Sequence, residues 1–332
     1  MTFVDERAEG RSVAVRPQGG PSVSVAICAY TMRRWDDLLA AVDSVLAQVQ
    51  PDDEVLLVID HNDELLARVR EQFAGATRVR VTANSGPRGL SGARNTAIDE
   101  SRGGAVAFLD DDAVAGAQWL ERMRSALADE HVMAVGTAAL PDWPGGRRPA
   151  WFPPEFDWVV GCSYLGLPEV PTDVRNVIGA GMAFRREAFD LAGRFSTVVG
   201  RIGTAPTGCE ETELCIRLRN AKPGTRVTYL PDVAVSHHVT PDRLRLRYFI
   251  RRCYGEGLSK ARVARLVGAD AGLSTERRYV TSVLPRGVLR ELGRGVRGEW
   301  PGFLAATLIV GGFLVTGTAY AAGRLMRAGD AA

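Results

Sequence analysis

Residues 105–114 read AVAFLDDDAV, and this stretch decides how the rest of the chain is interpreted. An apolar run over 105–109 predicts a buried strand, and three carboxylates follow it directly: Asp110, Asp111 and Asp112. Adjacent carboxylates repel one another and resist leaving water unless a positive group pairs with them. We therefore expect cations around these three side chains.

The residues before this stretch alternate between strand and helix patterns. Strands are predicted over 22–29, 54–60, 78–83 and 105–110, and helices over 35–49, 64–73 and 93–101. This order predicts an α/β fold with a helix-covered parallel sheet, in which ligands bind at the carboxyl ends of the strands. Tyr30, Asp60, Asn84 and the three aspartates all follow predicted strands, so we expect them to line a ligand cleft.

The second half is more irregular. We predict a helix over 119–129, strands within 132–140, 176–189 and 226–239, and helices over 209–221 and 243–267. The proline-rich stretch 141–158 has an aromatic group that either stacks on a ligand or packs the core. We favour ligand binding, with Trp151 and Trp158 as its candidates. The group is Trp143, Trp151, Phe152, Phe156 and Trp158.

Charge is distributed unevenly along the chain. Residues 1–242 hold 25 basic and 33 acidic side chains, whereas 243–300 hold 14 basic against 5 acidic. A basic stretch of this kind indicates an anionic surface, either phospholipid or nucleic acid. No nucleic-acid-binding motif is present and an apolar segment follows, so we expect the cytoplasmic membrane surface and no nucleic acid. The five scattered cysteines fit a reducing compartment.

The segment 301–323 carries no charged residue and is long enough to cross a bilayer. Because the basic stretch precedes it, we favour a transmembrane or membrane-surface helix with the rest of the chain on the cytoplasmic face of the cell membrane. The alternative is a buried or hairpin helix of a soluble domain. Removing 299–332 is expected to give a more soluble protein. Residues 1–21 form a polar arm and 324–332 a tail.

The acidic triplet is the most specific chemical signal. The chain contains no G-x-x-x-x-G-K-[ST] motif, and the glycines of loop 86–92 do not have dinucleotide-binding spacing. A divalent hard cation prefers oxygen ligands, and Mg²⁺ commonly bridges carboxylates and substrate phosphates. Asp-x-Asp at a strand end therefore predicts a metal–diphosphate site, with a solvated acidic turn as the alternative.

These motifs together resemble the GT-A-fold glycosyltransferases of family 2, in particular actinobacterial membrane-associated members acting on lipid-linked or cell-envelope acceptors. The resemblance implies a Rossmann-like, mostly parallel sheet with helices on both faces. It also implies a catalytic domain over 22–240, with a nucleotide-sugar half (22–115) and an acceptor half (116–240), then a basic helical region (241–300). The stretches that carry it are 23–38, 54–60, 89–99, 107–114, 179–189, 209–219 and 236–239.

The resemblance also implies a role for individual residues around a nucleoside-diphosphate sugar. Tyr30 and Thr31 border the nucleoside, Asp60 contacts the base, and Arg94 holds the nucleotide sugar. The metal, Mn²⁺ or Mg²⁺, is bound by Asp112 and approached by His237, while Asp110 and Asp111 face the ribose and the metal shell. The weaker acceptor-side candidates are Trp151, Trp158, Glu210 and His238, and His238 is also the second choice for the metal.

Glu211 is the predicted general base of an inverting transfer. The family usually shows Glu-Asp here, where this chain has Glu210-Glu211. On a helix, Glu211 shares a face with Leu214 and Leu218, and burial raises a carboxyl pKa toward that of a usable base. Glu213 instead has Arg217 four residues on, and we expect an exposed pair there.

Two other functions fit parts of the sequence. The DDDAV stretch matches the first motif of haloacid-dehalogenase-like phosphotransferases, in which Asp110 would be the nucleophile. That interpretation leaves the Glu211 helix and the 89–99 loop unexplained. A non-catalytic nucleotide-sugar-binding protein is the other alternative, and donor turnover separates it from an enzyme.

Overall fold

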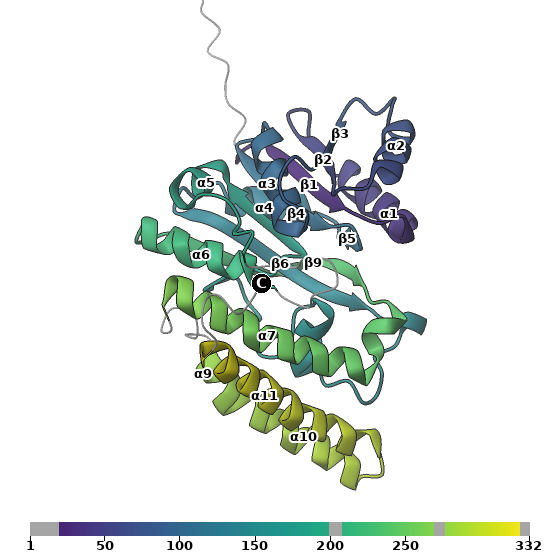
Figure 1. Ribbon diagram of the computed structural model, residues 1–332, viewed down its shortest axis with the longest axis vertical. Helices are drawn as coiled ribbons and strands as arrows, with labels where there is room; N and C mark the ends of the chain where they lie inside the picture. The colour runs from purple at the N-terminus through teal and green to yellow at the C-terminus, as the bar shows by residue number, and fades with distance from the viewer. Residues whose placement is uncertain (1–19, 199–207, 269–275, 326–332) are drawn as a thin grey trace, which may run out of the picture.

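The computed structural model describes residues 20–198, 208–268 and 276–325. Its centre is a mixed nine-stranded sheet with the order β3-β2-β1-β4-β8-β6-β9-β5, and β7 pairs with β9 (Figure 1). The strands are β1 (Val23–Ala29), β2 (Glu54–Ile59), β3 (Val79–Ala83), β4 (Ala105–Asp110), β5 (Ala113–Ala115), β6 (Val132–Asp142), β7 (Thr172–Asp173), β8 (Gly181–Arg185) and β9 (Arg226–His238).

The first four strands form the parallel part of this sheet, as predicted. β1 lies between β2 and β4, with Cys28 opposite both Val58 and Asp110. Near-continuous Val, Ile and Leu runs suit strands that are buried on both faces. The carboxyl ends of β1, β2 and β4 therefore meet at one edge, which brings Tyr30, Asp60 and Asp110 together.

The remaining strands mix both directions. β8 is antiparallel to β4 and β6, β6 is parallel to β9, and β5 is antiparallel to β9. The last pairing places Ala113 opposite His237 and lets His238 N–H donate to the Asp112 carbonyl at 2.8 Å. The end of β9 is thereby held against the aspartate triplet, 125 residues away along the chain.

Helices cover both faces of the sheet, which confirms the predicted fold class. One face packs against α1, α2 and α4, and the other against α3, α5 and α6. The helices are α1 (Trp35–Leu46), α2 (Asp63–Gln72), α3 (Leu90–Glu100), α4 (Trp119–Ala126), α5 (Arg186–Ala192), α6 (Glu210–Ala221), α7 (Leu246–Val267), α9 (Glu276–Arg278), α10 (Leu284–Val296) and α11 (Pro301–Leu325), with short helical turns η1 (Met32–Arg34), η2 (Pro144–Gly146), η3 (Pro154–Val160), η4 (Pro241–Leu244) and η5 (Tyr279–Val283).

A third hydrophobic core joins the proline-rich loop to the C-terminal helices. Phe152 and Phe156 are buried and stack on Phe249 of α7, at ring-centroid distances of 5.7 and 5.2 Å. Trp143 lies at the same core. Most of the aromatic group of this loop therefore packs the core, contrary to our expectation of an acceptor-binding wall, because α7 and α11 supply the apolar partners that the loop itself lacks.

Helix α11 is long and apolar enough to cross a membrane, yet 39% of its most apolar window is buried in the protein. It runs beside α7 and α10 at the end of the molecule away from α1 and α2 (Figure 1). Gly312 lies so close to Phe156 and Phe249 that no Cβ would fit. Removing 299–332 would expose this core, so the structure reverses the expectation of a more soluble truncated protein.

Candidate active site

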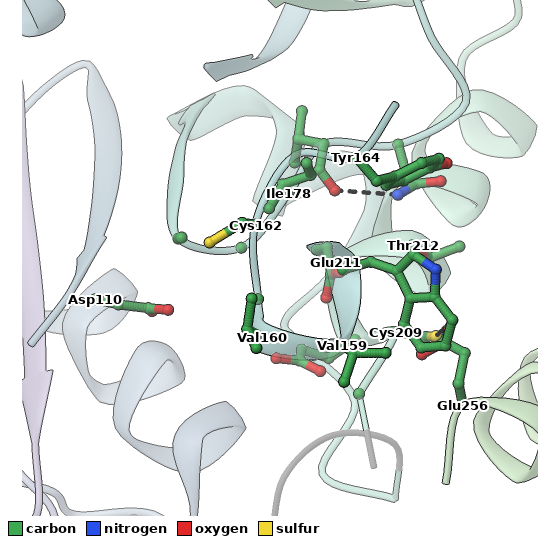
Figure 2. Close-up of a pocket in the computed structure, with 18 of the residues that line it drawn as sticks. Asp110, Val159, Val160, Cys162, Tyr164, Ile178, Cys209, Glu211, Thr212 and Glu256 are labelled. Carbon is green, nitrogen blue, oxygen red and sulfur yellow. Dashed lines mark hydrogen bonds between the residues drawn. The ribbon is translucent and has the colours of Figure 1, made fainter. Parts of the chain in front are cut away.

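A cavity of about 1090 Å³ opens where the parallel strands end. Its walls come from β1, β2 and β4 on one side and from η3, α6, α7, η5 and α11 on the other. Figure 2 shows Asp110 on one side, facing Glu211, Tyr164, Cys209 and Glu256 across the space. The predicted carboxylate cluster and the predicted base thus share one cavity.

Two arginines pair with Asp111 and Asp112 of the triplet. Arg34 Nη1 lies 2.5 Å from Asp111 Oδ1, and its Nη2 lies 3.0 Å from Asp112 Oδ2. Arg243 Nη2 lies 3.0 Å from the same Asp112 oxygen, and its Nη1 donates to the Val160 carbonyl at 3.0 Å. The expectation of cationic partners is confirmed, although neither arginine was identified from the sequence.

The other side of the triplet has the geometry of a divalent-cation site. Ligand atoms of Asp110, Asp112 and His237 all lie within 4.8 Å of one another, with His237 Nε2 3.4 Å from Asp112 Oδ1 and 4.0 Å from Asp110 Oδ2. Within the described ranges, no hydrogen-bond partner reaches the buried atoms Asp111 Oδ2 and His237 Nδ1. Two carboxylates and an imidazole suit Mn²⁺ or Mg²⁺, so the residues present fit the ion.

The register of β9 decides which histidine faces the site. Burial lowers the pKa of His237, which keeps its imidazole in the neutral form that ligates metals. His238 points to the opposite side of the strand, is half-buried, and its Nδ1 lies 3.8 Å from Asp142 Oδ2. His238 does not line the cavity, so the geometry does not support its weaker metal and acceptor assignments.

Arg94 connects the aspartates to the helix of the base. It is fully buried, with Nη1 3.0 Å from Glu210 Oε1 and Nη2 3.2 Å from Asp110 Oδ1. Nη2 also donates to the Gly179 carbonyl at 3.1 Å. Arg94 and Glu210 both line the cavity, but they form an internal ion pair that fixes α6 against β4.

Asp60 organises the part of the cavity that lies at the end of β2. Its Oδ2 accepts the Gly89 N–H at 2.9 Å and its Oδ1 accepts Asn84 Nδ2 at 2.6 Å, so the carboxylate holds the glycine-rich loop in place. Tyr30 is exposed and lines the cavity, so its ring is accessible to a ligand. Thr31 does not line it, because its hydroxyl accepts the Arg33 N–H at the start of η1.

Glu211 lies at the start of α6 and faces the cavity. Burial, reinforced by the neighbouring Glu210 carboxylate, raises the pKa of Glu211 to about 8. No ion pair or side-chain hydrogen bond to its carboxylate occurs among residues 20–198, 208–268 and 276–325. A carboxylate of raised pKa aimed into a ligand cavity is the arrangement of a general base.

Glu213 differs from the expectation in one respect. It does pair with Arg217, at 2.6 Å, but its own side chain is buried and Arg217 also donates to the carbonyls of Ala192 and Arg194. The pair therefore ties α6 to the end of α5. It is a structural contact, so replacing Glu213 costs more than an exposed pair would.

The predicted acceptor aromatics separate in the structure. Trp158 lines the cavity and its Nε1 donates to the Tyr279 hydroxyl at 3.1 Å, with Arg252 stacked over its ring at 5.8 Å. Trp151 packs against Phe152 and is absent from the lining, so its assignment to the acceptor is not supported. Residues of α7 and α11 also line the cavity, among them Phe313 and Tyr320.

Comparison with known proteins identifies the family at this point. The model of glycosyl transferase family 2 matches residues 24–192, from β1 to the end of α5. The chain belongs to glycosyl transferase family 2. The haloacid-dehalogenase-like interpretation of Asp110 is thereby overturned, because the triplet follows the fourth strand of a glycosyltransferase domain.

Relatives and solved structures agree with this membership. The chain is 34% identical, over 72% of its length and 76% of the relative's, to a glucosyl-dolichyl phosphate glucuronosyltransferase of Haloferax volcanii. In fold it is similar to a Pyrobaculum calidifontis mannosyltransferase in complex with GDP-Man and Mn²⁺, with a TM-score of 0.58, 19% identity and coverage of 91% and 89%. It also matches GalNAc-T7 with UDP, GalNAc and Mn²⁺, at a TM-score of 0.52 and 16% identity, over 72% of this chain and 48% of that one. The GT-A fold of this family 2 member is therefore shown.

Proposed function

We propose that this glycosyltransferase is an inverting, metal-dependent enzyme that transfers a sugar from a nucleoside-diphosphate donor to a hydroxyl of a lipid-linked acceptor. The observation that carries the proposal is the cavity that has the Asp110–Asp112–His237 cluster on one side and Glu211 on the other. In such a site the metal cluster can hold the charged leaving group while Glu211 accepts a proton from the attacking hydroxyl, with the reacting groups positioned between them.

At the donor end, Tyr30 stacks on the nucleoside and Asp60 retains accepting capacity for the base while it holds the glycine-rich loop. Asp110 and Asp111 face the ribose and the metal shell. Arg94 acts through its neighbours, because both of its carboxylate partners are part of the site. Rigid support of this kind keeps the reacting groups in place before the donor arrives.

Asp112 and His237, together with Asp110, would hold Mn²⁺ or Mg²⁺. When bound, the ion supplies Lewis-acid stabilisation of the negative charge that develops on the departing nucleoside diphosphate. Arg34 and Arg243 offset negative charge at the opposite edge of the triplet, where Asp111 and Asp112 are buried. Burial still raises the pKa of Asp111 to about 7.

Glu211 would accept the proton of the acceptor hydroxyl. The hydroxyl oxygen forms a bond to the anomeric carbon as the bond to the diphosphate oxygen breaks, and the proton goes to the Glu211 carboxylate. Attack from the face opposite the diphosphate inverts the anomeric configuration, and no covalent sugar–enzyme intermediate is needed.

The acceptor end supports a lipid-linked substrate. Besides Glu211, the cavity is lined by Arg252 and Lys260, which pair with Glu256, and by the aromatic side chains Phe313 and Tyr320 of α11. A phosphate-bearing head and an apolar chain would contact the charged and the aromatic parts of this lining. The name of the Haloferax volcanii relative includes a dolichyl phosphate, which is consistent with this class of acceptor.

We further propose that the protein works at the cytoplasmic face of the cell membrane, since α11 is apolar and the helices before it are basic. The test of function is a panel of nucleoside-diphosphate sugars with Mn²⁺, scored by thermal stabilisation and by transfer to a polyprenyl-phosphate glycan. A donor that stabilises the protein but is never turned over would favour the non-catalytic binding protein.

A further inference from the structure

The helical hairpin formed by α10 and α11 has the reverse of the usual surface pattern. On α10, Leu289, Leu292 and Val296 point outward with exposed fractions of 70%, 39% and 80%. Gly287, Glu291 and Gly295 form the buried face of the same helix. A helix of a soluble domain normally buries its apolar stripe and exposes its charges, so α10 is arranged for an apolar surrounding.

Helix α11 continues this outward apolar face. Phe303, Val310 and Leu314 are exposed, and their spacing of seven and four residues places them on one stripe. Both helices turn their opposite faces to the same core, to which α10 contributes Leu284 and α11 contributes Ile309. We call the six exposed side chains Leu289, Leu292, Val296, Phe303, Val310 and Leu314 the outer face.

Ion pairs on the buried side of α10 neutralise its acidic side chain and two of its arginines. The Glu155 carboxylate of η3 is fully buried and pairs with Arg290 at 2.8 Å. Glu291, also buried, pairs with Arg290 and Arg294 at 2.7 Å each. This network attaches α10 to the catalytic domain and removes its acids from the surface.

The charge left at the surface is positive. Glu276 pairs with Arg175 and Lys260, and Glu299 pairs with Arg294. Arg286 and Arg297, at the two ends of α10, are exposed. An apolar stripe bordered by exposed arginines matches the boundary between the anionic headgroups and the acyl chains of a membrane leaflet.

The packing of α11 against its neighbours indicates whether this helix lies in one leaflet or crosses the bilayer. Helix α11 contacts α7 closely enough that a Cβ on Gly257 would strike the backbone of Thr316, and it contacts α10 along its other side. If α11 crossed the bilayer, α7 and α10 would cross with it. That would carry Arg251, Glu256 and Arg290 among others to membrane depth, where each charge costs about 2.5–3.5 kcal/mol by insertion measurements.

We therefore propose that the outer face of α10 and α11 inserts into one leaflet of an anionic bilayer and that α11 does not span it. The inference rests on the membrane association proposed above and adds the surface and the mode of binding. The last turn of α11 then stays on the same side as the catalytic domain, and the α11 part of the cavity lies at the level of the lipid.

Vesicle flotation of the full-length protein tests the surface. The protein should bind to vesicles of phosphatidylcholine with phosphatidylglycerol. The triple variant Leu289→Ser, Leu292→Ser, Val296→Ser should bind to the same vesicles at least tenfold more weakly, an order-of-magnitude expectation from the apolar area removed. The control replaces two leucines and a valine of comparable exposure on the catalytic domain: Leu140→Ser, Leu191→Ser and Val198→Ser. Equal loss in both triple variants, or binding unaffected by the first, overturns the outer face as the contact.

Protease access to an epitope tag placed after Ala332 tests whether α11 lies in one leaflet or spans the bilayer. In sealed inside-out membrane vesicles the tag and the catalytic domain should be digested together. A tag protected inside such vesicles would show that α11 spans, which overturns this inference while the proposed membrane association stands. Absence of the wild-type protein from both membranes and vesicles would overturn the association itself, and donor turnover remains a separate test of the enzyme.

Discussion

Arg243 Nη2 lies 3.0 Å from Asp112 Oδ2 and joins the basic region 241–300 to the acidic triplet. The pair is buried, and Arg243 also binds the Val160 carbonyl of η3. The segment after β9 therefore contributes directly to the site. Arg243 offsets the negative charge at one oxygen of Asp112, as a divalent cation would at the other oxygen.

Replacing Arg243 should reveal this charge balance. In Arg243→Met the Asp112 carboxylate loses one of the arginines that pair with it, and loss of one partner of a buried pair costs about 3 kcal/mol of unfolding free energy. Added Mn²⁺ should then raise the melting temperature more in the variant than in the wild type, because the ion replaces the missing positive charge. Thermal melts with and without Mn²⁺ measure this, and an equal or smaller Mn²⁺ shift in the variant would contradict it.

Asp112→Asn should remove the response to divalent ions. The amide keeps the shape of the side chain but is a weaker ligand, so most activity and most of the Mn²⁺-induced rise in melting temperature should disappear while the protein stays folded. Asp142→Asn is the control, since Asp142 is exposed beside His238. Wild-type rates and an intact Mn²⁺ response in Asp112→Asn would remove Asp112 from the metal site.

Replacing a buried arginine and an exposed arginine should lower the free energy of unfolding by different amounts. Arg94→Met leaves the carboxylates of Asp110 and Glu210 without their shared partner in a buried place, at a cost of about 3–5 kcal/mol. Arg226→Met breaks an exposed pair with Asp129 and should cost about 1 kcal/mol or less. Urea unfolding of both variants measures the difference, and similar midpoints would show that Arg94 does not organise the site.

Adjacent glycines on α11 test whether this helix is part of the core. A Cβ on Gly312 would overlap the Phe156 ring, whereas a Cβ on Gly311 meets nothing within 4 Å. Gly312→Ala should destabilise the protein by about 1–3 kcal/mol through overpacking, and Gly311→Ala should be neutral or slightly stabilising. A detachable anchor would tolerate both changes equally, which melting in the same detergent would show.

The sequence was sufficient for the parallel half of the fold and for part of the site. Strand β4, the triplet at its end and Glu211 follow from periodicity and from carboxylates placed on apolar elements. The triplet shows that cations are needed, but tertiary pairing alone selects Arg34 and Arg243 from 41 basic residues. The choice between His237 and His238 depends on the β5–β9 register, because a shift of one residue exchanges the faces of a strand.

The proline-rich stretch 141–158 shows a different limit of prediction from sequence. Its prolines correctly predict irregular backbone, yet its rings are buried because α7 and α11 cover them from more than 80 residues away. Long-range packing of this kind has no local signature. The same packing makes Glu213 a buried residue, where an i, i+4 spacing alone suggests an exposed pair.

Glu211 and Glu213 form a matched pair of substitutions on one helix. Glu213→Gln should lower stability, because Arg217 loses a charged partner, while turnover per folded molecule is preserved. Glu211→Gln should have the opposite effects. The pKa of the Glu211 carboxyl is raised to about 8 in the folded state, so its contribution to stability is full below pH 4.5 and is lost as pH rises through 8. The glutamine variant should therefore be more stable than the wild type at pH 9.

The turnover of Glu211→Gln across pH tests the central claim most directly. A general base must be deprotonated, so wild-type kcat/KM should rise with pH to a plateau above about 8, and the variant should be about 10²–10⁴-fold slower with that rise absent and donor affinity unchanged. Normal turnover in Glu211→Gln, with the wild-type pH profile retained, would contradict the assignment of Glu211 as the base.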